Sequence, residues 1–202
     1  MMVAYSNHMT IVFTLGLLLF LVVHSIRIFA DGWRMQEVKR WGEARWKLLH
    51  TLVSLIGVGL LIWGFRAARA ESSLLWTPPR AMKHAASVLN LVAFVFVAAA
   101  YVPGNRIKAE LGHPMVLGTM IWALAHLLAN GTVVHAILFG GFLLWAALDF
   151  SALRRRDRLA GIRYPVLGRS RDFLAVGAGA IAWFVFARFG HLWLIGVSPL
   201  GP

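Results

Sequence analysis

Long apolar runs, separated by short charged segments, make up most of the chain. Six runs approach the ~20 residues that a helix needs to cross a hydrocarbon core about 30 Å thick. A backbone that crosses such a core must satisfy its own hydrogen bonds, which a helix does. The pattern therefore predicts an all-α bundle of six transmembrane helices, forming one domain over residues 1–202. The expected spans are residues 9–30, 46–66, 83–102, 113–130, 132–150 and 172–195.

The fourth and fifth runs are separated only by Asn130-Gly131. This pair favours a left-handed residue at the end of one helix, and Thr132 is a suitable cap for the next. We therefore expect a tight helical hairpin. Glycine pairs in three spans are expected to allow close approach of neighbouring helices. They are Gly57/Gly59, Gly140/Gly141 and Gly177/Gly179.

The charged segments place the helices relative to a membrane. The first, third and fifth connections carry fourteen lysines and arginines, and the second carries three, at Arg66, Arg69 and Arg80. The positive-inside rule then puts both termini on the non-cytoplasmic side. The segment after Ser151 is expected to be a short arginine-rich loop. The fourteen are Arg34, Lys39, Arg40, Arg45, Lys47, Arg106, Lys108, Arg154, Arg155, Arg156, Arg158, Arg163, Arg169 and Arg171.

Composition agrees with a membrane protein. The chain is 59% hydrophobic and 14% charged, against about 25% charged in a typical soluble domain. The net charge of +12 follows from the basic loops, so we expect no nucleic-acid partner. With 0 cysteines, disulfides, iron–sulfur clusters and thiolate zinc sites are excluded. The N-terminus lacks the positive region of a cleavable signal peptide.

Histidines inside the apolar runs are the main candidates for chemistry. His126 lies on a helical stripe of small and polar residues formed by Thr119, Ala123, His126 and Asn130. An ionisable residue in a span is a functional candidate by default, so this stripe is expected to face the interior of the bundle. No Asp or Glu lies in mid-span, which disfavours zinc or di-iron sites. Neutral imidazoles suit haem b, whose porphyrin supplies four further nitrogens.

The second haem ligand is expected to be His24, with His84 as a substitute. Arg27, one turn beyond His24, has the charge to pair with a propionate. His126 lies about 20 Å along its helix from the inner face and His24 only about 9 Å, so haem would have to tilt. The alternative is that these histidines are structural. Their rings would then form hydrogen bonds within the bundle or lie at the membrane–water interface. His50 and His113 fall near the inner boundary, His135 and His191 near the outer one, and His8 is expected to be exposed.

With these residues in hand, the chain resembles the NnrU family of bacterial membrane proteins nearly end to end. The resemblance is carried by LVSLIGVGLLIWGF, WTPPRAMKH, AAYVPGNRIKAELGHPMVLGTMIWALAHLLANG, ILFGGFLLWAALDF and WLIGVSPL. It implies a multi-pass protein of the bacterial inner membrane. It also implies an association with nitrite and nitric oxide reduction in denitrification.

The same block resembles plant zeta-carotene isomerase, a haem b protein whose iron is held by histidines. That resemblance implies His24 and His126 as ligands. The isomerase and many bacterial members have Arg before His-Pro, whereas this chain has Gly112. A more distant resemblance is to membrane methyltransferases that use an Arg-His-Pro motif. Gly112 breaks that motif, so we rank a methyltransferase function lower.

Three functions stay open at this stage. The first is a haem b protein in nitrogen-oxide metabolism, and the second is a haem-dependent isomerase of a polyene. The third is an assembly or transport helper without a cofactor. Expected partners are membrane lipids, a small apolar ligand or nitric oxide, and further copies of the chain.

Overall fold

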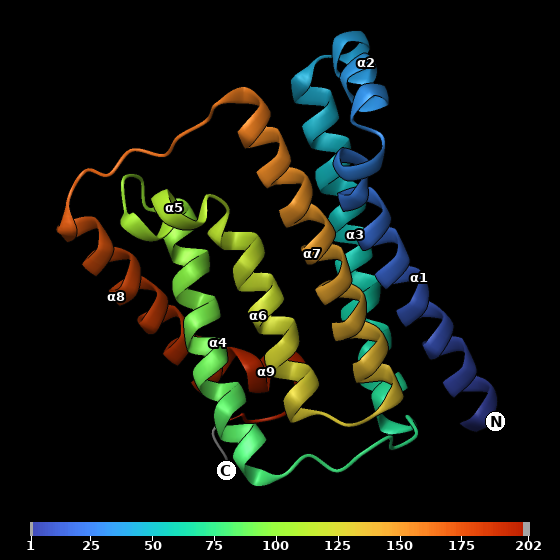
Figure 1. The fold of residues 1–202 in the computed structure, drawn as a ribbon. Coiled ribbons are helices and arrows are strands. Elements are labelled where there is room, and N and C mark those ends of the chain that lie inside the picture. The colour runs from blue at the N-terminus through green and yellow to red at the C-terminus, as the bar shows by residue number, and fades with distance from the viewer. Residues whose placement is uncertain (1, 200–202) are drawn as a thin grey trace. The chain divides into compact units, whose positions relative to one another are not determined.

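A computed structural model describes residues 2–199 as an all-α fold (Figure 1). Its contacts divide into two compact units. The first comprises the chain up to Ser73 together with Thr132–Val134. The second comprises Leu74–Gly131 and the chain from His135 onward. The expected single domain remains a prediction.

The first unit is built on two long helices that pack along their length, α1 (Met2–Phe29) and α3 (Glu43–Ala70). Glycines set how closely they approach. A Cβ at Gly64 would overlap the backbone of Phe13, and a Cβ at Gly16 would overlap the backbone of Leu61. Phe13 is 1% exposed and its ring lies 6.0 Å from that of Phe65. This close packing follows the small-residue rule for helices in lipid.

The second unit is centred on α4 (Arg80–Tyr101), which contacts α6 (Pro114–Ala129) and α8 (Arg169–Val185). Glycines again mark the contacts. Gly118 of α6 lies against Ala93, and Gly179 of α8 lies against Val95. The chain continues from α8 through a π-helical turn, η1 (Phe186–Gly190), into α9 (His191–Ile195).

The tight hairpin expected of the fourth and fifth runs stays a prediction, although aromatic side chains of the two runs meet. The ring of Trp122 on α6 lies 5.1 Å from that of Phe139 on α7 (Val133–Ala160). The predicted left-handed end is wrong, because Asn130 is extended, with φ −130° and ψ 135°. Gly131 is needed for a different reason. Its carbonyl accepts the N–H groups of Leu75 and Trp76, and a Cβ at this position would overlap the Trp76 carbonyl.

Five of the expected spans are confirmed as helices long and apolar enough to cross a membrane. The fourth, α6, has 16 residues, which is about 24 Å of helix and less than the hydrocarbon thickness. The five are His8–Phe29, Glu43–Ala70, Arg80–Tyr101, Val133–Ala160 and Arg169–Ile195.

The connections contain more helix than the sequence led us to expect. The arginine run after Ser151 is not a loop, because α7 continues to Ala160 and ends at Gly161, with φ +62°. Arginine is a good helix former and is favoured near a helix C-terminus. Two short helices, α2 (Asp31–Trp41) and α5 (Arg106–Leu111), occupy the first and third connections.

Candidate functional site

His24 lies in the last turns of α1, in the first unit. Its Nδ1–H donates to the Phe20 carbonyl at 2.8 Å, so Nε2 carries the lone pair of the neutral ring. The ring stacks on Phe20 with centroids 4.0 Å apart and lies edge-on to His50 at 4.9 Å. His24 therefore belongs to a histidine pair that connects α1 to α3. Arg27 is exposed one turn further on.

His126 lies near the end of α6, in the second unit. Its Nδ1–H donates to the Trp122 carbonyl at 2.9 Å, which again leaves the lone pair on Nε2. The ring stacks on Phe139 with centroids 4.5 Å apart. Metal-binding histidines commonly donate their second ring N–H to a carbonyl, so His24 and His126 have the same ligand-like orientation.

The other members of the His126 stripe are satisfied within their own helix. Ala123 is fully buried, at 0% exposure. The Thr119 hydroxyl donates to the Met115 carbonyl at 3.1 Å, and the Asn130 amide donates to the His126 carbonyl at 2.9 Å. A cofactor contact by Thr119 or Asn130 stays a prediction.

Two further histidines surround His126, and the sequence did not connect them to it. The ring of His191 lies 6.5 Å from that of His126, with 21° between the planes. The His191 Nδ1–H donates to the Val197 carbonyl at 2.7 Å. His135 is 8% exposed and stacks on Phe139 at 6.0 Å. His84, the substitute ligand, is exposed in the first turns of α4.

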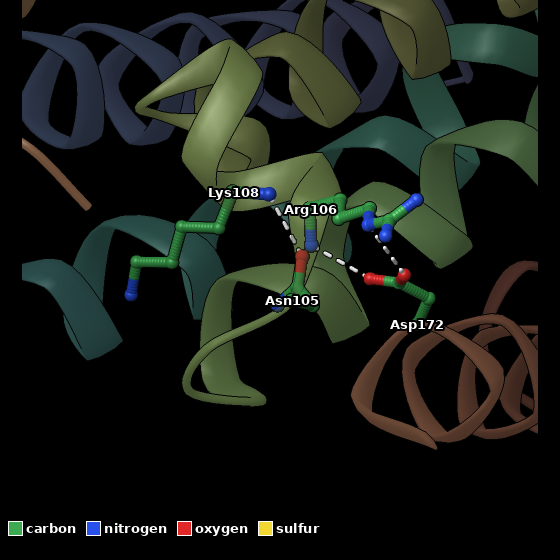
Figure 2. Close-up of polar contacts among 4 residues, drawn as sticks. All are labelled: Asn105, Arg106, Lys108 and Asp172. Carbon is green, nitrogen blue, oxygen red and sulfur yellow. Dashed lines mark hydrogen bonds and ion pairs between the residues drawn. The ribbon is translucent and has the colours of Figure 1, made fainter. Parts of the chain in front are cut away.

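One end of the second unit holds a network centred on Asn105 (Figure 2). Asn105 is 0% exposed; its side-chain oxygen caps α5 by accepting the Lys108 N–H at 2.7 Å, and its amide donates to the Ala99 carbonyl at 2.7 Å. The Asp172 carboxylate accepts the Arg106 N–H at 2.6 Å. These bonds connect the end of α4, α5 and the start of α8.

At the same end of the unit, Asp157 joins α6, α7 and the following loop. Its carboxylate lies 2.8 Å from His113 Nε2, without the alignment of a hydrogen bond, and accepts the Tyr164 hydroxyl at 3.0 Å. Partial burial and the bond to Asp157 raise the pKa of Tyr164 above its usual value.

Gly112, the residue before His113-Pro114, has φ +74°. This backbone conformation favours glycine. A Cβ here would lie 3.0 Å from Nη1 of Arg154. In this chain a guanidinium therefore reaches the position from α7.

No group of three or more His, Asp or Glu side chains within residues 2–199 is arranged to hold a metal ion. His24 and His126 lie in different units, so their joint ligation of one iron stays a prediction.

Long apolar helices, small-residue packing and basic connections define an all-α, multi-pass membrane protein. The chain belongs to the NnrU protein family, whose sequence model matches residues 12–199. No curated protein and no solved structure matches it in the other two comparisons.

Proposed function

We propose that this NnrU family member binds haem b through His126 and a second imidazole, for which the sequence favours His24. The observation that carries the proposal is the shared orientation of the two rings. Each donates Nδ1–H to the carbonyl four residues earlier. Each therefore presents Nε2 as its ligand nitrogen, the arrangement expected of a metal-binding histidine.

The residues around His126 fit a flat apolar group. Phe139 and Trp122 flank the imidazole, and helices in lipid offer an apolar environment. The chain has 0 cysteines, so a thiolate ligand is excluded, and the histidines within the apolar helices are the favoured ligands. A porphyrin supplies the remaining nitrogens and, when bound, one-electron and nitric oxide chemistry. Arg27, Thr119 and Asn130 are the proposed polar contacts of the group.

The proposed setting is the bacterial inner membrane, with six spans and both termini outside the cytoplasm. There the protein would act in, or support, nitrite and nitric oxide metabolism, the role associated with the family. A haem-dependent isomerase of a polyene is the second candidate, because an apolar substrate could reach His126 from the bilayer. A helper without a cofactor is the third.

The absorption spectrum of the purified protein tests the proposal. We expect a Soret band in protein produced with haem supplied. His126→Ala should lose it or shift it strongly. His8→Ala is the control, because His8 is exposed on α1. A colourless protein that elutes as one folded species would contradict haem binding and favour the helper.

A further inference from the structure

A pocket of about 170 Å³ lies at the last turns of α7, within the second unit. It begins about 22 Å along the helix from Phe139, on which His126 stacks. We propose that this pocket binds a phosphate group through the guanidinium groups of Arg154, Arg158 and Arg163. The inference is independent of haem. The pocket is lined by Arg154, Asp157, Arg158, Gly161, Ile162 and Arg163.

The end of the helix brings the third arginine to the other two. α7 ends directly before Gly161, which has φ +62°. The Gly161 N–H donates to the Arg158 carbonyl at 3.4 Å. The Ile162 N–H donates to the Asp157 carbonyl at 3.0 Å. These two bonds form a Schellman motif, which turns the chain back at the helix end, so Arg163 joins the pocket wall that Arg158 already forms.

The three guanidinium groups have no counter-ion in the part of the chain that the structure describes. None of them forms a hydrogen bond or an ion pair with another residue among 2–199. Arg154 and Arg158 are four residues apart, so their side chains lie on the same face of α7. Arg154 is half-buried, whereas Arg158 and Arg163 are exposed to solvent. An anion between these groups would relieve the repulsion among them.

Asp157 is the one acid among the lining residues, and its carboxylate is already engaged. It lies 2.8 Å from His113 Nε2 and accepts the Tyr164 hydroxyl at 3.0 Å. Three positive charges against this one negative charge leave a surplus of two. The C-terminal end of a helix carries only about half a negative charge. The pocket therefore stays attractive to an anion.

The position of the pocket favours phosphate over carboxylate, although guanidinium groups pair bidentately with both. α7 has 28 residues, which is about 42 Å of helix, and the hydrocarbon core is only about 30 Å thick. Arginine is costly inside that core, so the arginine-rich end of α7 is expected at the level of the lipid headgroups. Phosphate is the anionic group that phospholipid headgroups share, and basic pockets at this level bind it.

The volume of the pocket fits one such group. About 170 Å³ corresponds to about five waters, at about 30 Å³ for each in the liquid. A phosphate group fits this space without rearrangement of the helix end. The group could belong to an anionic lipid or to a soluble phosphate compound, because both present the same oxygens to the arginines.

Thermal unfolding of the purified full-length protein in an uncharged detergent tests the site. A ligand that binds the folded state raises the unfolding midpoint, and the concentration dependence of that rise gives its Kd. The probes are phosphatidylglycerol, phosphatidylcholine and inorganic phosphate, all at constant ionic strength. We expect phosphatidylglycerol to raise the midpoint more than phosphatidylcholine. If inorganic phosphate raises it as well, the source is a soluble phosphate compound; if it does not, the source is the lipid.

A pair of matched double variants locates the binding. Arg158→Gln/Arg163→Gln removes two exposed charges from the pocket, so this variant should fold normally. The Kd of the probe that binds should rise at least about tenfold, because two charge-assisted hydrogen-bonding groups are lost. Arg155→Gln/Arg169→Gln is the control, since both side chains are exposed, neither lines the pocket and the same net charge is removed. It should change that Kd by less than about twofold.

Three results would overturn the phosphate site. Equal weakening by the two double variants would mean that the basic connection attracts anions without a defined pocket. An unchanged Kd in Arg158→Gln/Arg163→Gln would place the binding elsewhere. Absence of any effect of inorganic phosphate, together with equal effects of the two lipids, would mean that the pocket takes no phosphate. The absorption spectrum that tests haem is unaffected by any of these results, so the two proposals fail separately.

Discussion

Hydrogen bonds from side chains to the carbonyl four residues earlier recur along the apolar helices. His24, Thr119 and His126 all make them. In lipid these bonds satisfy a polar atom that water cannot reach. They also fix the direction of each ring, so the same contact that removes the cost of burial orients an imidazole for a ligand.

Tyr164 makes the clearest pH-dependent contact outside the spans. Burial and the bond to Asp157 raise its pKa in the folded protein. A raised folded pKa stabilises the fold below the unfolded pKa, near 10, and the contribution is lost as pH rises through the folded value. Tyr164→Phe should therefore lower stability by about 1 kcal/mol at neutral pH. The difference from the unchanged protein should shrink above pH ~10.

Chemical unfolding in detergent across this pH range measures the difference. Subtracting the Tyr164→Phe curve removes the titration of lysines common to both proteins. A gap that stays constant or widens above pH ~10 would contradict the role given to the Tyr164–Asp157 bond.

The burial or exposure of a single residue was predictable where it depends only on neighbours in the sequence. The exposure of His8 and the burial of the His126 stripe at Ala123 agree with the sequence pattern. The nearness of His191 to His126 and of His50 to His24 was not predicted. Those contacts join separate helices, and single-sequence reasoning assigned each histidine only a depth. The π-helical turn before His191 was not predicted either.

At the scale of helices, glycine position decides how α1 and α3 pack. Gly64 faces Phe13 so closely that an added Cβ would overlap backbone, whereas Gly59 on the same helix has open space around it. Gly64→Ala should destabilise the protein by about 1–3 kcal/mol, because backbone must move. Gly59→Ala should be neutral or slightly stabilising, because alanine favours helix.

Unfolding of both variants by denaturing detergent measures the pair under identical conditions. The matched substitution keeps helix propensity equal, so the difference reports packing alone. Equal stability of the two variants would show that α1 and α3 do not approach at Gly64.

The sequence predicted only some of the glycines at which neighbouring helices approach closely. Gly57 and Gly179 lie at close contacts as expected, while nothing approaches Gly59, Gly140 or Gly177. Helices in lipid are apolar on every side, so hydrophobic periodicity does not identify the packed face. Gly16, Gly64 and Gly118 were missed for the same reason.

At the scale of the whole molecule, hydropathy located the helices and charge suggested their direction. Span positions were predictable because every crossing needs a long apolar run. Helix ends were not, since α7 runs on through Arg154, Arg155 and Arg156 to Ala160. Which helices pack together into each of the two units depends on how their side chains fit. Hydropathy carries no information on that fit.

Within the second unit, the basic residues of the third and fifth connections gather at one end. Arg106 pairs with Asp172 at the start of α8, and His113 meets Asp157 near the end of α7. The segment before α4 lies at the other end of that helix. If the positive-inside rule sets the orientation, the Asp172 end faces the cytoplasm.

Cysteine labelling tests this orientation without background from the chain, which has 0 cysteines. Leu75 and Ile162 are matched apolar loop positions, 55% and 51% exposed. A membrane-impermeant maleimide should label Leu75→Cys in intact bacterial cells. If the positive-inside rule holds, it should label Ile162→Cys only after the membrane is opened, because Ile162 lies in the arginine-rich connection between α7 and α8. The reverse pattern would invert the topology, and labelling of both positions in intact cells would mean that the segments flanking α4 and α7 do not lie on opposite sides of the membrane.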